Sequence, residues 1–120
     1  MYIFLSKYYS ILTKCHFVFL EKKSIAFDVQ LKSDVINLAI NRRVVFGKVD
    51  LNEGNGYDPS TGVFTAPASG MFVFDWTTLT ERGKSAYTTF VVNGKSKSWS
   101  LCHDDVSKIY LQCSKMTVVK

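Results

Sequence analysis

The stretch from Gly54 to Trp76 constrains the fold more than any other part of the chain. Four glycines and two prolines divide it into short pieces, and these residues favour tight turns in which the backbone φ is positive or fixed. Between the turns lie short runs of β-branched and aromatic residues, at 63–65 and 71–74, which suit pleated strands. The stretch therefore predicts strand, corner and strand in an all-β protein, with no room for a helix.

Further strands are predicted on both sides of this stretch. Residues 44–51 read as a strand that precedes it. Downstream, residues 86–92 form a strand that ends at Asn93-Gly94, a dipeptide typical of two-residue hairpins, and 95–101 form the return strand. One or two more strands are expected within 109–120. Strands at short spacing with turns between them predict a β-sandwich.

The signature-like sequence Gly-Tyr-Asp-Pro-Ser-Thr-Gly-Val-Phe-Thr-Ala-Pro-Ala-Ser-Gly-Met-Phe-Val-Phe, at 56–74, resembles that of the complement C1q globular-head family, within the tumour-necrosis-factor-like superfamily. The resemblance extends to 26–29, 44–49 and 87–94, so that it covers about Ser24 to Lys120. It implies a jelly-roll β-sandwich. The residues that match the family signature and are expected to be structural are Phe46, Gly56, Tyr57, Pro59, Gly62, Phe64, Pro67, Gly70, Phe72 and Phe74.

The resemblance also implies that the domain is incomplete. The family continues beyond the position of Lys120 through a turn and two further strands. One of these strands lies between the strand at 26–29 and the strand that begins at Met71. Without it, the backbone edges on either side would be unpaired and the core would be open, which favours association. The sequence therefore predicts a jelly roll, formed by residues 24–120, that lacks its last strands.

The stretch 1–23 begins with a segment, Met1 to Leu20, that is rich in apolar and aromatic residues, but Lys7 and Lys14 interrupt the apolar runs. A secretory signal needs an uninterrupted apolar stretch of about 7 to 15 residues followed by a small-residue cleavage site, and neither is present. A membrane span needs about 20 mostly apolar residues, so no stable span is predicted. We interpret this stretch as an atypical leader outside the fold, with a degenerate signal anchor as the alternative.

The charge of the chain argues against a nucleic-acid partner. The formal net charge is +5, and residues 1–24 carry +3 of it, so the β region is nearly balanced. An enzyme is not predicted either, because the histidines are His16, in the leader, and His103. Cys102, His103 and Asp104 are adjacent, but neighbours on an extended strand point to opposite faces and form no catalytic relay.

The three cysteines are an odd number, so they do not all pair within the chain. Cys102 and Cys113 form a disulfide if their strands are neighbours, and otherwise they are two partly buried thiols; the sequence leaves both alternatives open. A zinc site needs about four convergent nitrogen or sulfur ligands, which this pattern does not supply.

Few residues are candidates for ligand contacts. Trp99 lies outside the signature on the predicted return strand, and His103 lies in the following loop; both are candidates for a ligand-binding surface. Asp104 and Asp105 form an acidic pair, and calcium binding at this pair is a hypothesis that rests on resemblance to the family, since calcium prefers several oxygen ligands together. No other cofactor is expected.

The function that the resemblance implies is recognition. Short members of this family without a collagen repeat resemble secreted, lectin-type innate immune proteins, and this chain has no Gly-x-y repeat. Such proteins bind carbohydrate or other surface ligands as homotrimers, which gain avidity from three weak sites. The alternatives are a cytokine-like trimer that binds a protein receptor, and a truncated fragment without activity.

Overall fold

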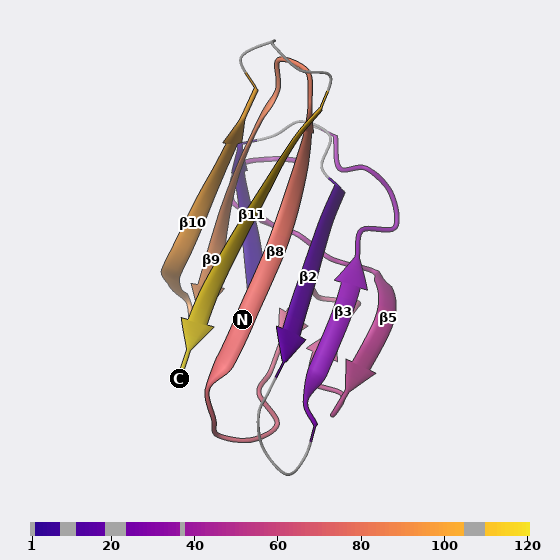
Figure 1. The fold of residues 1–120 in the computed structure, drawn as a ribbon, viewed down its shortest axis with the longest axis vertical. Coiled ribbons are helices and arrows are strands. Elements are labelled where there is room, and N and C mark those ends of the chain that lie inside the picture. Colours follow the sequence, from indigo (N-terminus) through magenta and orange to yellow (C-terminus); the bar gives the residue numbers. More distant parts are fainter. Residues whose placement is uncertain (1, 8–11, 19–23, 37, 105–109) are drawn as a thin grey trace.

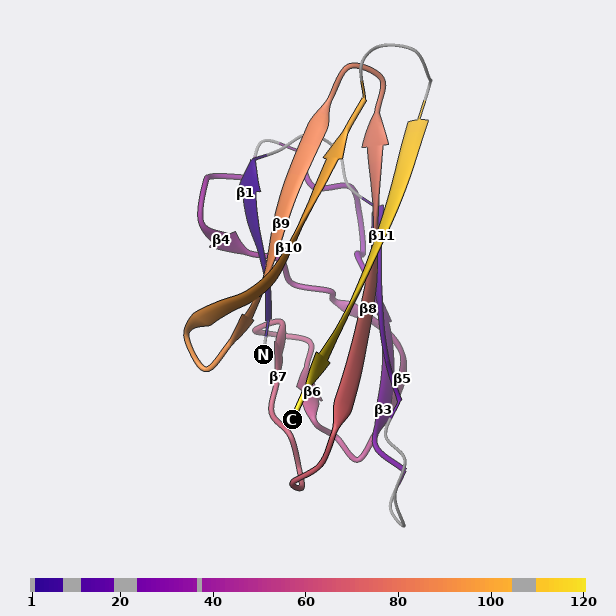
Figure 2. The same cartoon turned by 60° about the vertical axis from the view of Figure 1, so that its left-hand side comes forward.

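Two facing antiparallel sheets form the protein in the computed structural model, as Figures 1 and 2 show. The structure describes residues 2–7, 12–18, 24–36, 38–104 and 110–120, and for the first two ranges it describes the backbone alone. Within these ranges no helix occurs. The strands are β1 (Tyr2–Lys7), β2 (Leu12–Val18), β3 (Ala26–Gln30), β4 (Arg42–Arg43), β5 (Lys48–Glu53), β6 (Tyr57–Asp58), β7 (Val63–Phe64), β8 (Phe72–Glu81), β9 (Ser85–Val92), β10 (Lys95–His103) and β11 (Tyr110–Val119).

The strand order agrees with the predicted β-sandwich. One sheet has the order β10-β9-β1-β4, and the other has the order β11-β8-β2-β3-β5. A small hairpin, β6-β7, lies beside them. Sequence neighbours are often separated in the sheets, as expected for a jelly roll, in which the chain crosses repeatedly between the two layers. The predicted jelly-roll β-sandwich is therefore confirmed.

The two longest buried strands alternate strictly between core and outer face. Along β8, every second side chain from Phe72 to Thr80 is buried between the sheets, and β9 repeats this pattern from Ala86 to Phe90. This period of two is the geometry of a strand with one face in the core.

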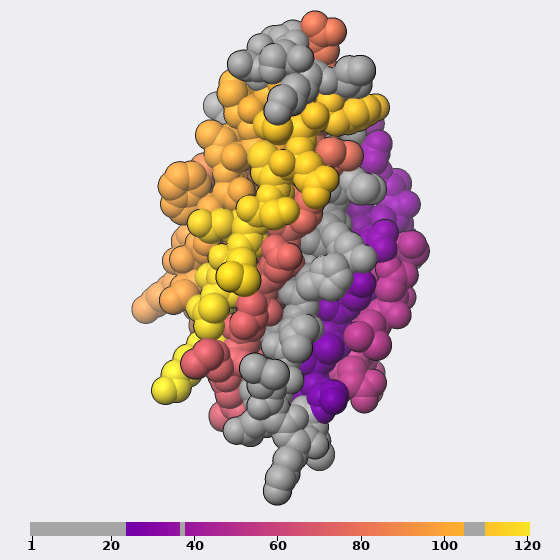
Figure 3. Space-filling model, in the orientation of Figure 1, coloured from indigo at the N-terminus to yellow at the C-terminus, as the bar shows by residue number. Residues whose placement is uncertain are grey.

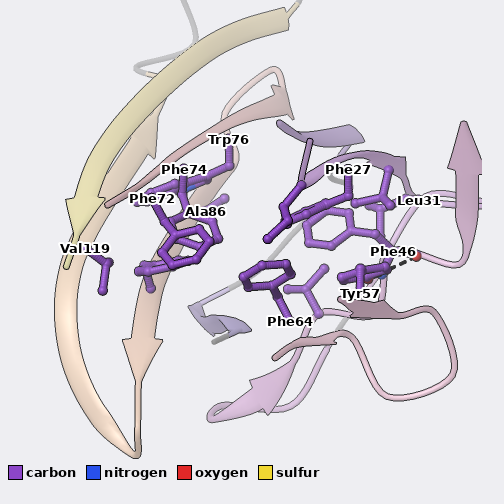
Figure 4. Packing of buried hydrophobic residues seen from close by; sticks show 14 of the residues in the cluster. Phe27, Leu31, Phe46, Tyr57, Phe64, Phe72, Phe74, Trp76, Ala86 and Val119 are labelled. Carbon is purple, nitrogen blue, oxygen red and sulfur yellow. Dashed lines mark hydrogen bonds between the residues drawn. The ribbon is translucent and has the colours of Figure 1, made fainter. Parts of the chain in front are cut away.

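Aromatic rings fill the core between the sheets, as Figure 4 shows. Phe27 stacks on Tyr57 and on Phe64, with ring centroids 5.1 Å apart in both pairs. Phe74 and Trp76 extend the cluster towards Phe90. Because Phe64 and Tyr57 come from the turn-rich signature, the corners of the chain are packed into the same core as the strands. The signature is therefore largely a packing motif.

The segment before the signature differs from the predicted continuous strand. Strand β5 begins at Lys48, and residues 44–47 do not belong to any strand. Val44 and Phe46 are nonetheless buried. The Tyr57 hydroxyl accepts a hydrogen bond from the Phe46 N–H at 3.1 Å and donates one to the Phe46 carbonyl at 3.0 Å. This side chain replaces a neighbouring strand as the partner of the buried backbone.

The turn at Asn93-Gly94 confirms the predicted hairpin. Both residues have positive φ, 48° and 77°, as a two-residue turn between twisted strands requires. The turn joins β9 to β10, which pair from Val92 and Lys95 onwards. The expected one or two strands near the C-terminal end of the sequence are a single strand, β11, which pairs with β8 along its whole length.

Within residues 1–23, interpreted above as a leader outside the fold, the structure describes 2–7 and 12–18, and both of these segments are strands of the sheets. Strand β1 pairs with β9 and β4, and strand β2 pairs with β3 and β8. Segments of six and seven residues are too short for a membrane span but have the usual length of strands, and a strand tolerates a charged residue such as Lys7 or Lys14. The position between β3 and β8, expected to be empty, is occupied by β2 (Figure 1).

Candidate functional site

An aromatic pair, the exposed Trp99 and the half-buried Tyr87, lies on the outer face of the β9–β10 hairpin. The side chain of Trp99 is 58% exposed, and its ring stacks on Tyr87 with centroids 5.7 Å apart and planes at 18°. Trp99 lies opposite Thr89, and Leu101 lies opposite Tyr87, so the stacked rings are diagonal neighbours across the two strands. Stacking on Tyr87 restricts the rotation of the Trp99 side chain, so that its ring is held in one orientation on the surface.

A register shift puts Trp99 on this face. The pairing of β10 with β9 shifts between Ser96 and Ser98. Counting from the turn without this shift would set Trp99 opposite Thr88, a buried residue, and would place it on the core face. The irregularity therefore turns the indole outward. The shift has no clear signature in the sequence.

A shallow hollow of about 440 Å³ adjoins the tryptophan, where β10 borders β11. It is lined by Lys97, Ser98, Trp99, Ser100, Leu101 and Lys115. Figure 3 shows β11, in yellow, beside β10, in orange, along one side of the molecule. Ser98 and Ser100 lie opposite the buried Phe90 and Thr88, so their side chains are on the other face of β10 from Trp99. Lys97 and Lys115 give this surface positive charge, and Trp99 gives it an aromatic plane. These are the groups that recognise polar ligands with a flat apolar face.

A disulfide holds the two strands together next to this hollow. Cys102 of β10 and Cys113 of β11 are bonded, with Cα atoms 5.7 Å apart. The two strands belong to different sheets, so the bond ties the sandwich together at this edge. Of the two alternatives that the sequence left open, the structure has the disulfide.

His103 ends β10, and its side chain is exposed. Its Nδ1 forms a hydrogen bond of 2.5 Å with the hydroxyl of Ser85, the first residue of β9. His103 is four residues from Trp99 along a strand, about 13 Å away at the usual rise per residue, so the two candidate ligand residues do not form one compact site.

Asp104, one of the two calcium candidates, is 3% exposed. Its Oδ2 accepts a hydrogen bond from the Gly83 N–H at 2.9 Å, and its own N–H donates to the Lys84 carbonyl at 3.2 Å. The residue therefore fastens the end of β10 to the β8–β9 turn. Asp105, the other candidate, lies outside the described residues. Among the residues that the structure describes, no three His, Cys, Asp or Glu side chains are grouped to hold a metal ion.

Asp58 organises the turn between β6 and β7. Its carboxylate accepts hydrogen bonds from the Ser60 hydroxyl at 2.6 Å, from the Ser60 N–H at 2.8 Å and from the Thr61 hydroxyl at 2.9 Å. These donors stabilise the charged form and hold the pKa of Asp58 below its usual value of 3.8. The hydrogen-bond donors to Asp58 thus come from residues of its own turn.

A second, larger hollow of about 920 Å³ lies at one end of the sandwich. The loop 65–71, the Asn93-Gly94 turn and residues 119–120 line it. Met71, on its rim, is 59% exposed. This hollow was not predictable from the sequence, because it is formed by segments far apart in the chain. The only local signal was the concentration of turn residues in the signature.

The signature residues lie partly in the core and partly in the turns around β7. Phe46, Tyr57, Phe64, Phe72 and Phe74 are buried in the core. Gly56 and Gly62 are buried in turns, where a Cβ atom would lie 2.5 Å from the Phe64 ring and 2.6 Å from the Val44 carbonyl, respectively. The remaining signature residues form the exposed or half-buried turns at either side of β7: Pro59, Pro67 and Gly70.

Comparison with known proteins agrees with this architecture. A family model described as the C1q domain matches residues 26–120. The chain is 31% identical over 90 residues to a protein of Mytilus edulis named heavy metal-binding protein HIP; the match covers 75% of this chain and 41% of the relative. The chain thus spans well under half of that relative's length. No solved structure matches the chain significantly. Within the described residues, no helix has the length and apolar character to cross a membrane.

Proposed function

The chain belongs to the C1q domain family, and from this premise we propose that it is a secreted recognition module that binds carbohydrate on surfaces through the outer face of its β9–β10 hairpin. Members of this family, and the mussel relative by its name, are non-enzymatic binding proteins. Recognition of a ligand, rather than its chemical conversion, is therefore the general function of the fold here.

The observation that carries the proposal is the exposed Trp99 ring stacked on Tyr87. An aromatic plane that is held in place offers the apolar face of a sugar ring a surface to stack on at low cost in side-chain entropy. Lys97 and Lys115 line the hollow beside the indole, and their ammonium groups can donate hydrogen bonds to the polar edge of the same ligand. A single site of this size binds weakly.

We therefore propose that the protein acts as a homotrimer. Three such sites on one rigid particle bind a surface with repeated ligands far more tightly than one site does, because the later contacts are intramolecular. The disulfide between Cys102 and Cys113 supports an extracellular location, since such bonds form and persist in oxidising compartments. Secretion and a part in innate immunity remain elements of this proposal.

A competing function is that of a cytokine-like trimer whose partner is a protein receptor. It predicts binding to a protein and no dependence on Trp99. A fragment without activity, the remaining alternative, predicts neither. The name of the mussel relative refers to heavy metals, so the test includes a metal-binding measurement. The described residues of this chain supply no group of three metal ligands.

The test is a glycan-array and surface-binding experiment with the full chain, together with its mass in solution. We expect a trimer, and binding to a subset of glycans that Trp99→Ala reduces at least tenfold. Met116→Ala is the control, since Met116 is 64% exposed on β11 outside this surface. The proposal is wrong if the native protein binds no glycan, or if both variants bind as the parent does. Titration with zinc and copper tests metal binding separately.

A further inference from the structure

Two strands outside the family-matched region occupy inner positions, one in each sheet. The family match begins at residue 26, whereas β1 and β2 end at Lys7 and Val18. β2 lies between β8 and β3, and β1 lies between β9 and β4. In Figure 1, β2 separates β8 from β3 along its whole length. Without β1 and β2, one sheet is therefore divided into β10-β9 and β4, and the other into β11-β8 and β3-β5.

The register shows how completely β2 fills its position. It pairs with β8 from Leu12 to Val18 and with β3 from Lys14 to Val18, both antiparallel. Neighbouring strands lie about 4.8 Å apart, so β8 and β3 are separated by about 10 Å and cannot bond directly. Among the described strands, β2 is the only connection between β11-β8 and β3-β5.

β1 has the same relation to the other sheet. It pairs with β9 over five register positions, from Tyr2 opposite Val91 to Lys7 opposite Tyr87, and with β4 at Phe4 and Leu5. β1 pairs mainly with β9, and β2 pairs mainly with β8. These two partner strands are consecutive in the chain but lie in opposite sheets. The segment 2–18 thus supplies one strand to each layer of the sandwich.

The strands that border the two positions carry the centre of the core. Phe27 and Val29 of β3, Phe74 and Trp76 of β8, and Phe90 of β9 are 3% exposed or less. Without β1 and β2, the backbone N–H and C=O groups beside these residues would lose their partners, which destabilises the fold wherever such a group stays buried. Four open strand edges would also face solvent, and such edges pair with other chains.

We propose that strands β3 to β11 form a strand-acceptor site, and that residues 2–7 and 12–18 of the same chain are its ligand: two strands of six and seven residues, one inserted into each sheet antiparallel to its neighbours. Recognition rests on main-chain hydrogen bonds along both sides of each inserted strand, as in other cases of strand addition. The donor precedes the acceptor in the sequence, whereas the strands that the family resemblance implied would follow it. The segment that sequence analysis set apart is, in this proposal, part of the domain.

A disulfide test on the full chain decides whether the donor lies where the register puts it. His16 is opposite Asp75, and directly opposed residues of antiparallel strands have Cα atoms about 4.5–5.5 Å apart, within disulfide range. In a Cys15→Ser background, we expect His16→Cys with Asp75→Cys to oxidise to an intrachain bond that migrates as a monomer on a non-reducing gel. The control, His16→Cys with Leu79→Cys, is four residues out of register and is not expected to form the bond.

Absence of the bond in the first pair, or equal bonding in both pairs, overturns the assignment of β2 to this position. Covalent dimers or trimers in place of the monomer overturn the intramolecular assignment, because the donor strand would then come from a second copy of the chain.

A proline substitution tests whether the donor strand β2 is required for the stability of the sheet. Proline lacks the N–H that an inner strand donates, so Cys15→Pro at the centre of β2 should open the sheet. We expect amide exchange in β3 and β8 to become roughly 100-fold faster or more, which corresponds to the cost of a misplaced proline. Lys22→Pro, between β2 and β3, is the control and should leave these amides protected. The proposal fails if the amides of β3 and β8 are equally well protected from exchange in the two variants.

Discussion

The Tyr57 hydroxyl makes two hydrogen bonds to the backbone of Phe46, accepting from its N–H and donating to its carbonyl (Figure 4). Both residues are buried, at 5% and 2% exposure. Asn52 in turn holds the Tyr57 backbone, because its side-chain amide donates to the Tyr57 carbonyl and accepts from the Tyr57 N–H. A single tyrosine therefore joins the segment before the signature to the signature itself.

Tyr57→Phe should destabilise the domain by about 1–3 kcal/mol, because it leaves two buried backbone groups of Phe46 without their partner while the ring still fits. Urea denaturation monitored by tryptophan fluorescence, at one fixed protein concentration, measures this change. Tyr110→Phe is the matched control, since Tyr110 is 57% exposed, and its effect should be within about 0.5 kcal/mol of zero. Equal stabilities of the two variants would contradict the assigned role.

The disulfide leads to a prediction about both chemistry and stability. The chain has three cysteines, and Cys102 is bonded to Cys113, so thiol titration of the unreduced protein in urea should find one thiol per chain. The bond closes a loop with a sequence separation of 11, for which the chain-entropy estimate is about 3 kcal/mol. A reducing agent should accordingly lower the thermal midpoint by about 10 °C.

The double variant Cys102→Ser with Cys113→Ser controls for other effects of the reducing agent. Its midpoint should match that of the reduced parent and should not change when the agent is added. Three free thiols in the unreduced parent would show that the bond is absent in solution.

Features of the fold that depend on a few adjacent residues were predictable from the sequence. Asn93-Gly94 fixes a two-residue turn by its backbone preferences alone, and the alternation within 71–80 follows from burial of one face. The jelly-roll sandwich followed from the resemblance. These predictions needed no knowledge of which segments meet in space.

Features set by distant contacts were not predictable. Residues 44–47 have strand-like composition but form no strand, and the backbone of Phe46 within them is bonded to the Tyr57 side chain. The Cys102–Cys113 bond depends on β10 and β11 meeting across two sheets. The outward direction of Trp99 depends on a one-residue register shift. The placement of β1 and β2 depends on open positions in sheets formed by the rest of the chain.

Two glycines with the same backbone conformation should respond differently to alanine. Gly62 and Gly94 have φ of 73° and 77°, so both substitutions carry the cost of a left-handed residue, about 1–2 kcal/mol. At Gly62 the new Cβ would also lie 2.6 Å from the Val44 carbonyl oxygen, whereas at Gly94 nothing lies within 4 Å. Gly62→Ala should therefore cost about 1–3 kcal/mol more than Gly94→Ala in urea denaturation. Equal losses would mean that the close approach of the β6–β7 turn to Val44 is not rigid.

Asp58 gives a prediction for the dependence of stability on pH. Three hydrogen bonds from Ser60 and Thr61 favour its carboxylate, so the pKa of Asp58 in the folded protein is below the value of 3.8 expected when the chain is unfolded. A group whose folded pKa is depressed adds stability at pH values above its unfolded pKa and loses that contribution as the pH falls through its folded pKa. The contribution of Asp58 should thus be complete near neutral pH and disappear below pH 3.8.

Asp58→Asn should consequently be less stable than the parent at neutral pH, and the difference should shrink as the pH falls below 3.8. Urea midpoints measured across the acid range test this, and a carbon-detected NMR titration of the Asp58 carboxyl gives its pKa directly. The exposed Asp34 is a suitable comparison, because Asp34→Asn should produce a smaller difference at neutral pH. A constant difference between Asp58→Asn and the parent from neutral to acidic pH would show that the ionised carboxylate does not organise the turn.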